Sequence, residues 1–277
     1  MAWDSLIGDV NSYFVKYDIT RDYAWNFDHA PESNQIDAAP VAGEWAYCGV
    51  PVDSPLGIAA GPLLNGNWML YYSALGFDIL TYKTVRSRER ASYELPNLQP
   101  IAWDGGEVPT ELSVASKMNG SWAVSFGMPS KSPSFWRDDV AATRSHLDKG
   151  KFLCVSVVAT AQDGWLIDDI ADDYAQCAKW AAGSGADGVE ANFSCPNVSS
   201  VDGQLFLNPT DAGIVAAKMR EAIPQTPLLL KVGHIENREI AHALLESVAA
   251  SVDALVMVNG VSAKVRQPNG GVLFEGP

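Results

Sequence analysis

The sequence predicts an α/β fold and, within that class, a (β/α)8 TIM-type barrel of which about six of the eight strand–helix units are present. Short apolar segments rich in β-branched residues alternate with longer amphipathic segments, which is typical of βαβ units and a parallel sheet. The 277 residues are close to the length of about 250 that one such barrel needs. An open six-stranded parallel sheet would expose its edges, which favours the barrel.

Six segments are predicted to be strands, and helical segments lie between them. The strands are expected at residues 56–60, 79–83, 152–159, 188–192, 228–232 and 254–259. Asn65 or Asn67 can cap a helix that ends near Gly76, and Ser134 precedes one that runs to Gly150. Asp168 opens a third helix, and Pro209 suits the first turn of a fourth that should stop at Pro224. The last helix is expected at about residues 237–250.

Two segments fall outside this repeating pattern. Residues 1–45 are expected to form an N-terminal arm, because their second half is polar and lacks a sustained period. Residues 46–277 form the predicted barrel domain. It carries an insertion at about residues 86–133, directly after the second strand. Because barrel active sites are built where strands end, the insertion is expected to cover the site.

The C-terminal part of the pattern stops short of a full barrel. No seventh or eighth unit follows residues 254–259, and Gly270 and Gly271 are expected in a loop after the sixth strand. We therefore expect a barrel that is truncated at its C-terminal end.

Composition excludes several classes of partner. A formal net charge of −14 repels nucleic acid and anionic lipid, so an anionic ligand must be held by local cations or backbone N–H groups. The wide spacing of the cysteines at 48, 154, 177 and 195 predicts neither a metal site nor a disulfide framework, and indicates a cytoplasmic protein.

No apolar run is long enough to span a bilayer. Residues 1–17 have helix-like apolar spacing but mixed charges, so they are expected to pack on the domain rather than on a membrane.

Polar side chains stand at the carboxyl ends of four predicted strands. Lys83, Asn192 and Asn259 end the second, fourth and sixth strands, and Lys231 lies near the end of the fifth. In a barrel these ends converge on one mouth. A lysine buried there without a partner would cost several kcal/mol, so each needs an anionic or polar ligand unless it reaches the solvent at the rim.

The segment EANFSCPNV at 190–198 is the strongest local signal. It places Asn192, Ser194, Cys195 and Asn197 on one strand-to-loop turn. Side-chain amides of this kind match planar imides such as a pyrimidine ring. Cys195 is the candidate proton acceptor, since nearby cations or amide dipoles can bring a thiol pKa toward neutral. The alternative is an inert buried thiol.

Six ordered motifs resemble the dihydroorotate dehydrogenase family from about Pro55 onward. These are LGIAAGPLLNG at 56–66, LGFDILTYKTVRSRERASYELPNL at 75–98, SFGMPS at 125–130, EANFSCPNV at 190–198, LLLKVG at 228–233 and VNGVSAKV at 258–265. LLLKVG alone would be a weak signal. Their shared order and spacing make the resemblance specific.

The resemblance implies FMN in the barrel mouth. Lys231 and Asn192 would lie beside the isoalloxazine ring and Lys83 between flavin and substrate. The implied cofactor-binding residues are Ala60, Gly61, Lys83, Asn192, Lys231 and Asn259. Substrate would be bound by Lys83, by backbone groups of Gly127 and Met128 near its carboxylate, and by Asn192, Asn197 and Asn259 around its ring.

Cys195 matches the base of the soluble family members, whereas the membrane-associated quinone-linked members resemble this chain except for a serine there. The implied reaction oxidises dihydroorotate, or a related dihydropyrimidine, to orotate. Cys195 removes a proton from one ring carbon while the neighbouring carbon passes hydride to the flavin. The implied partner is a small pyrimidine-like substrate, and a homodimer is left open.

Three departures qualify the resemblance. Val124 stands where the family usually has Asn, and Gly260 where a hydroxyl residue usually follows Asn259. Each loss would cost roughly 1–3 kcal/mol of recognition if a substrate group is left unpaired. The glycine-rich turns that hold the FMN phosphate in the family are also not found, so the truncated chain is expected to lack the phosphate half of the cofactor site.

Three alternative functions stay open at this point. A dihydropyrimidine dehydrogenase-like reductase is the nearest, although such enzymes usually carry His where Asn197 stands. A Schiff-base aldolase would use Lys83 or Lys231 as its nucleophile. The third is a non-catalytic truncated homologue that acts as a binding module.

Overall fold

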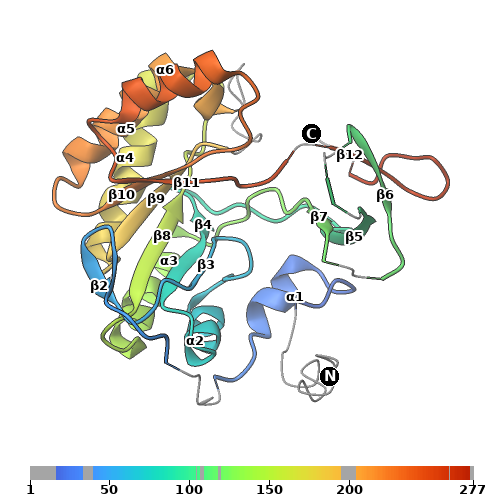
Figure 1. The fold of residues 1–277 in the computed structure, drawn as a ribbon, viewed down its shortest axis with the longest axis horizontal. Helices are drawn as coiled ribbons and strands as arrows, with labels where there is room; N and C mark the ends of the chain where they lie inside the picture. Colours follow the sequence, from blue (N-terminus) through green and yellow to red (C-terminus); the bar gives the residue numbers. More distant parts are fainter. Residues whose placement is uncertain are drawn as a thin grey trace.

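The computed structural model describes residues 17–33, 40–103, 105–106, 109–117, 120–194, 204–261 and 263–274. A curved parallel sheet with helices along one side occupies one part of the molecule, and a small sheet lies across from the strand ends (Figure 1). Among the described residues, no helix has both the length and the apolar character needed to cross a bilayer.

The large sheet confirms the predicted class, a partial (β/α) barrel. Its spatial order is β11-β10-β9-β8-β4-β3, and every neighbouring pair is parallel. The strands are β3 (Gly57–Ile58), β4 (Ile79–Val85), β8 (Phe152–Val157), β9 (Gly188–Asn192), β10 (Leu228–Lys231) and β11 (Ala254–Val256). All six predicted strands are present, but β3 and β11 are shorter than expected.

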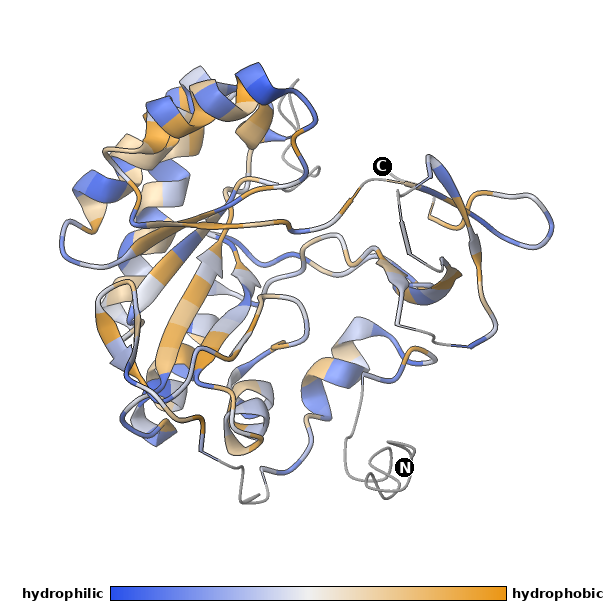
Figure 2. Cartoon of the chain, viewed as in Figure 1, coloured by the Kyte–Doolittle hydropathy of each residue, from blue (hydrophilic) through white to orange (hydrophobic). Residues whose placement is uncertain are grey.

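Helices cover the outer face of this sheet. They are α2 (Gly66–Ala74), α3 (Pro133–His146), α4 (Ile167–Gly183), α5 (Pro209–Ala222) and α6 (Arg238–Val248), with a short 3-10 helix (Leu205–Leu207) before α5. Alternate strand residues such as Leu80, Val155 and Val189 point to the helices and are fully buried in the main core. Figure 2 shows hydrophobic residues along β8 and hydrophilic residues on the solvent side of the outer helices.

Caps fix where these helices begin. Asn65, rather than Asn67, caps α2 by accepting a hydrogen bond from the Trp68 N–H. The prediction that Ser134 precedes α3 was wrong by two residues, because Ser132 is the cap and Pro133 takes the first turn. That helix also ends before Gly150, at His146. The predicted start of α5 at Pro209 is confirmed.

A β-hairpin closes the amino end of the sheet's inner face. It consists of β1 (Trp45–Tyr47) and β2 (Val50–Val52), which pair antiparallel. Val52 of the hairpin packs with Phe152, Cys154 and Leu229 of the strands in a separate apolar cluster. The half of the inner face near the amino ends of the strands, called the lower half below, is therefore packed with apolar side chains.

Ion pairs surround the amino ends of the strands. Asp187 directly precedes β9, and its carboxylate accepts hydrogen bonds from Arg144 at 2.5 Å and from the Leu153 N–H at 2.8 Å. Asp253 precedes β11 and binds Arg220 and the Leu228 N–H in the same way, at 2.5 and 2.7 Å. A third pair joins Asp78, before β4, to Lys151, before β8. The sequence analysis did not anticipate this network.

The insertion folds into a small sheet of its own. Its strands are β5 (Leu98–Ala102), β6 (Glu111–Val114) and β7 (Trp122–Val124), joined by β12 (Lys264–Arg266) from beyond the large sheet, in the order β12-β6-β5-β7. Ile101, Leu112 and Val265 form its core. The segment after the sixth strand, predicted to be a loop, thus contributes a strand to the insertion.

The described part of the arm contains a helix that the sequence did not predict, α1 (Tyr23–Asp28). Tyr23 and Phe27 pack with Leu64 and Trp68 in an apolar cluster of their own. The Trp68 indole N–H donates to the Asn26 carbonyl at 3.0 Å. The arm therefore packs on α2, beside the barrel mouth. The predicted helical stretch before Tyr17 lies outside the described residues.

Candidate active site at the carboxyl ends of the strands

The upper half of the inner face carries polar side chains where the lower half is apolar. Lys83, Asn192 and Lys231 lie at the ends of three strands and are only 5%, 2% and 5% exposed. The register places Asn192 directly beside Lys231. The structure therefore brings together three of the residues predicted from the sequence.

A hydrogen-bond network fixes the orientation of the Asn192 amide. Its Oδ1 accepts from the Ser194 hydroxyl at 2.9 Å and from the Ser194 N–H at 3.2 Å. Its Nδ2 donates to the Thr84 hydroxyl at 3.2 Å, and Thr84 in turn bonds Ser156 at 2.9 Å. The Tyr174 hydroxyl donates to the Asn192 carbonyl at 2.8 Å. This second layer holds the amide still, as a binding group requires.

Thr84 takes part because of an irregularity in β4. Four residues on β4, from Tyr82 to Val85, oppose three on β8, from Val155 to Val157. Such a β-bulge interrupts the alternation of side chains. Lys83 and Thr84, which are adjacent in sequence, therefore both serve the site.

Lys231 has a carboxylate partner within the barrel. Its Nζ lies 3.7 Å from Glu190 Oε1, and their side chains are 6% and 2% exposed. Glu190 stands two residues before Asn192, so both face inward. At this distance the contact is an ion pair rather than a hydrogen bond, and Oε1 accepts no hydrogen bond from the described residues. The pair leaves ammonium protons of Lys231 available to another acceptor.

Lys83 faces the loop that leads from the insertion to α3. Its Nζ lies 5.2 Å from the centre of the Phe126 ring, a cation–π contact. Gly127 and Met128 follow with φ of 75° and 53°. A side chain at Gly127 would approach the Tyr93 ring to 2.7 Å, so only glycine fits there. The predicted substrate loop thus lies against the predicted substrate lysine.

Ala60 and Gly61 follow β3 at the same edge of the sheet. Ala60 is buried at 4% exposure, whereas a Cβ built on Gly61 would meet no atom of the described residues within 4 Å. The Gly61 N–H is turned back to the Ala59 carbonyl at 2.7 Å. Backbone without a side chain beside open space allows a flat ligand to approach closely.

Asn259 lies just beyond β11 on the opposite margin of the mouth. Its N–H donates to the Val232 carbonyl at 3.0 Å, which extends the β10–β11 pairing. Unlike Asn192, it is exposed, as is Gly260. Val124 lies on β7 of the small sheet, pairs with Leu98 and is 54% exposed. These positions form the rim rather than the buried part of the site.

Cys195 and Asn197 lie outside the described residues. Ser194, the last described residue before them, is bonded to Asn192 at the mouth. The three described cysteines are poor candidates for the base that accepts the substrate proton, because their thiols are held in the neutral form. Burial raises the pKa of the Cys154 thiol well above its ordinary value, with the Glu190 charge adding to it, and burial also raises the pKa of Cys177 and Cys48.

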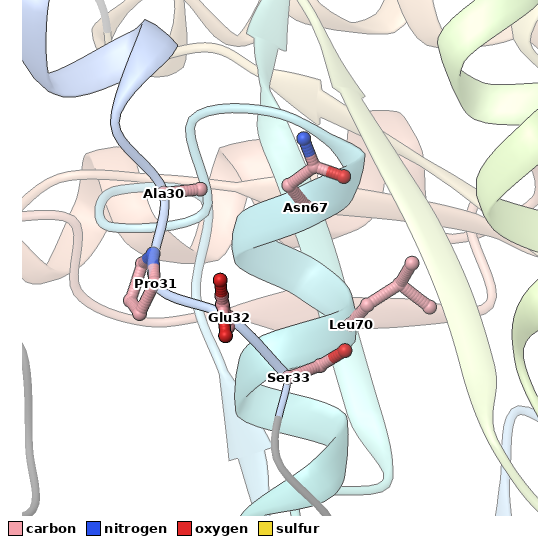
Figure 3. Close-up of a pocket in the computed structure, with 6 residues that line it drawn as sticks. All are labelled: Ala30, Pro31, Glu32, Ser33, Asn67 and Leu70. Atoms are coloured by element: carbon pink, nitrogen blue, oxygen red, sulfur yellow. The ribbon is translucent and has the colours of Figure 1, made fainter.

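A separate hollow lies between the arm and α2. Figure 3 shows it lined by Ala30, Pro31, Glu32, Ser33, Asn67 and Leu70. Among the described residues, no predicted site residue lines it and Glu32 is its only charged lining residue. The described part of its lining thus offers no cation for an anionic ligand, and we do not include it in the candidate site.

Sequence reasoning missed Thr84, Ser156 and Glu190. Glu190 could have been found, because a residue two positions before an inward-facing Asn192 must face inward as well. Ser156 follows from the register that pairs it with Glu190, and Thr84 from the bulge. Neither of these is visible in one sequence.

The fold and the site define a class, namely a (β/α) barrel protein with buried cations and amides at the carboxyl ends of its strands, where barrels place their active sites. The comparisons with known proteins then point to one family. The chain is 28% identical over 270 residues to dihydroorotate dehydrogenase of Dictyostelium discoideum, covering 90% of this chain and 72% of that protein. No protein-family model matches the chain.

Solved structures show the same fold. Dihydroorotate dehydrogenase of Eimeria tenella in complex with ferulenol superposes with a TM-score of 0.61 at 13% identity, covering 76% of this chain. Its ligand-free form gives a TM-score of 0.62 at 14% identity, covering 79%. This chain spans 58% and 61% of those two chains. Similarity in sequence and in fold therefore supports the family resemblance of the six motifs.

Proposed function

We propose that this protein is an FMN-dependent oxidoreductase of the dihydroorotate dehydrogenase type, acting on dihydroorotate or a related dihydropyrimidine. The observation that carries the proposal is the group formed by Lys83, Asn192 and Lys231 at one edge of the sheet. The similarity to the Dictyostelium enzyme points the same way. We also propose that residues 46–277 act as one barrel domain with its insertion over the mouth, in the cytoplasm.

The donor set suits a flavin. An isoalloxazine ring presents several acceptors along one edge and is flat, so it needs donors at its edge and bare backbone at its face. Lys231 and the Asn192 amide provide donors, and Gly61 provides backbone with open space above it. Asn259 lies on the opposite margin. When bound, FMN supplies a hydride acceptor.

A second set of residues, which shares Asn192 and Asn259 with the flavin, is assigned to the substrate. Lys83 and the backbone of Gly127 and Met128 bind its carboxylate, since the cation and the loop lie together. Asn192, Asn197 and Asn259 hydrogen-bond the ring. The Cys195 sulfur accepts the proton that leaves the ring carbon. The Glu190 carboxylate would hold Lys231 in place beside the flavin.

The choice of substrate depends on the rim. Val124 is exposed and apolar, and Gly260 offers no hydroxyl. Both are compatible with a dihydropyrimidine that needs fewer hydrogen bonds from the rim residues than dihydroorotate does. We expect titration with dihydroorotate and with dihydrouracil to bleach the flavin band for one of the two. The Val124→Asn variant should tighten orotate if the family pocket is retained, and unchanged binding would indicate another substrate.

A direct test uses Cys195→Ala. This variant should keep its yellow chromophore but lose substrate-dependent flavin reduction by roughly 10²–10⁴-fold, the range of general-base losses. Normal reduction would remove Cys195 from the mechanism. A chain with no flavin that is trapped by borohydride in the presence of a carbonyl substrate would instead support the aldolase.

A further inference from the structure

Arg86 is a buried charged residue to which the proposed mechanism gives no part. It is 1% exposed and follows β4, three positions after Lys83. Its guanidinium spans two segments that are far apart in sequence. Nε donates to the Met128 carbonyl at 3.0 Å, and the NH1 nitrogen donates to the Ala159 carbonyl at 2.7 Å.

The two carbonyls differ in how firmly they are held. Ala159 is fully buried just after β8, and the preceding N–H of Val158 donates to the Val85 carbonyl at 3.0 Å. Met128 belongs to a loop with two successive left-handed residues. The guanidinium therefore fastens the irregular loop to the rigid end of a central strand.

The backbone around Arg86 reinforces this link. Its N–H donates to the Ser130 hydroxyl at 3.1 Å, and its carbonyl accepts from the Trp136 indole at 3.1 Å. Ser130 also exchanges two backbone hydrogen bonds with Arg90, at 2.8 and 2.9 Å. These bonds anchor the far end of the loop and leave the orientation of Met128 to the guanidinium.

We propose that Arg86 is a positioning residue that aims the backbone of the Gly127–Met128 loop at an anionic group of the substrate bound beside Lys83. The Met128 carbonyl lies in the rigid peptide plane that joins Met128 to Pro129, and the proline ring fixes φ on the far side of that plane. Holding this carbonyl therefore limits how the preceding turn, which carries the N–H groups of Gly127 and Met128, can rotate. The guanidinium fork holds two carbonyls at once, which a lysine ammonium cannot do with the same geometry. Arg86 thus acts through the loop and selects for a carboxylate without touching it. The inference rests on the proposed function for the identity of the substrate.

The test uses Arg86→Lys in the full chain with FMN, and Arg220→Lys as the matched control. Arg220 also holds backbone carbonyls, those of Ser251, Ile223 and Thr226 at 2.9, 3.1 and 3.0 Å, but at the amino ends of the strands. Two quantities are measured: the dissociation constants of orotate and of uracil, which lacks the carboxylate, and amide exchange of residues 126–128 and 130.

Arg86→Lys should weaken orotate by about tenfold or more while uracil changes little, and amide exchange of the loop should speed up. Arg220→Lys should change neither. Equal weakening of both ligands, or unchanged loop exchange, would overturn the inference. If Arg86→Lys does not fold, Ser130→Ala loosens the same loop from the other side, and it should give a smaller loss of the same selectivity. If the unaltered protein binds neither ligand, the proposed function fails, and amide exchange alone then decides whether Arg86 holds the loop.

Discussion

The two ends of the same parallel sheet differ in how their charged side chains are paired. At the amino ends, Asp187 and Asp253 are bound by Arg144 and Arg220 and also accept strand N–H groups. Each of these carboxylates is bound by a guanidinium and a backbone N–H of the chain itself. At the carboxyl ends, the side chains of Lys83, Asn192 and Lys231 are buried, and the Lys231 ammonium lies 3.7 Å from Glu190, too far for a hydrogen bond.

The amino ends of the strands thus contribute to the stability of the fold, whereas we expect the carboxyl ends of the same strands to bind the ligand. The hairpin and the ion pairs close the amino end, so changes there should affect folding free energy and leave ligands alone. At the carboxyl end, buried cations in a chain of net charge −14 are where we expect an anionic ligand to bind.

The largest effect is expected from Lys231→Met at the carboxyl end. Glu190 would remain buried without its cation, which should lower the free energy of unfolding by about 3–5 kcal/mol. Flavin absorbance of the purified protein should be lost as well. Urea denaturation and the visible spectrum measure the two effects.

The double variant Glu190→Gln with Lys231→Met separates them. It removes both charges, so most of the stability should return while the flavin stays absent. Return of the flavin would show that Lys231 serves the fold rather than the cofactor.

A smaller loss is expected from Asp187→Ala at the amino end. The buried Leu153 N–H and Arg144 would each lose an acceptor, at a cost of about 1–3 kcal/mol in unfolding free energy. Flavin content and ligand affinity should not change, because the site lies at the other end of the strands. A changed ligand affinity in the folded variant would contradict the division between the two ends.

The variants Gly127→Ala and Gly49→Ala compare a loop at the carboxyl ends of the strands with the hairpin turn at their amino ends. Both glycines have positive φ, 75° and 80°, but only at Gly127 would a Cβ meet a neighbour, the Tyr93 ring. Gly127→Ala should therefore cost more stability, by roughly 1 kcal/mol, and should weaken orotate. Thermal denaturation of the two variants side by side gives the difference. Equal losses would mean that Tyr93 moves aside freely.

The smallest effect is expected where the small sheet receives β12. The Arg266 guanidinium donates to Glu111 at 2.8 Å and lowers the pKa of that carboxyl. A lowered folded pKa means that the pair stabilises above the carboxyl's unfolded pKa and that this contribution fades as pH falls through the folded pKa. Amide exchange of residues 264–266 should be slightly slower than in Glu111→Gln at pH 7, and the ratio should approach one in acid. A ratio independent of pH would contradict the pairing.

Local patterns in the sequence predicted much of the large sheet. Residues 188–192 were placed as a strand with both ends correct, since β-branched and apolar residues there are bounded by a turn and a helix. Pro209 and Pro224 bracket α5 because proline starts a helix and cannot continue one. Lys83, Asn192 and Lys231 could be grouped because parallel strands bring their carboxyl ends together.

What could not be predicted depends on pairing across long separations. Nothing local tells that β12 joins β6, about 150 residues earlier in the chain. The inward turn of Thr84 needs the bulge in β4, which is set by the register with β8. The Arg86 contacts likewise join three segments whose proximity only the folded chain creates.

The hairpin at the amino end also bears on the order of folding. Units such as β8–α4–β9 are made of neighbours in sequence and can form early, as soon as that stretch of chain is available. Residues 45–52 instead pack against Leu229, Ala254 and Val256, which follow about 180 to 200 residues later. Closing so long a loop is entropically costly until the strands have paired, so sealing of the inner face should be a late event, and the lower half of the barrel should stay hydrated until then.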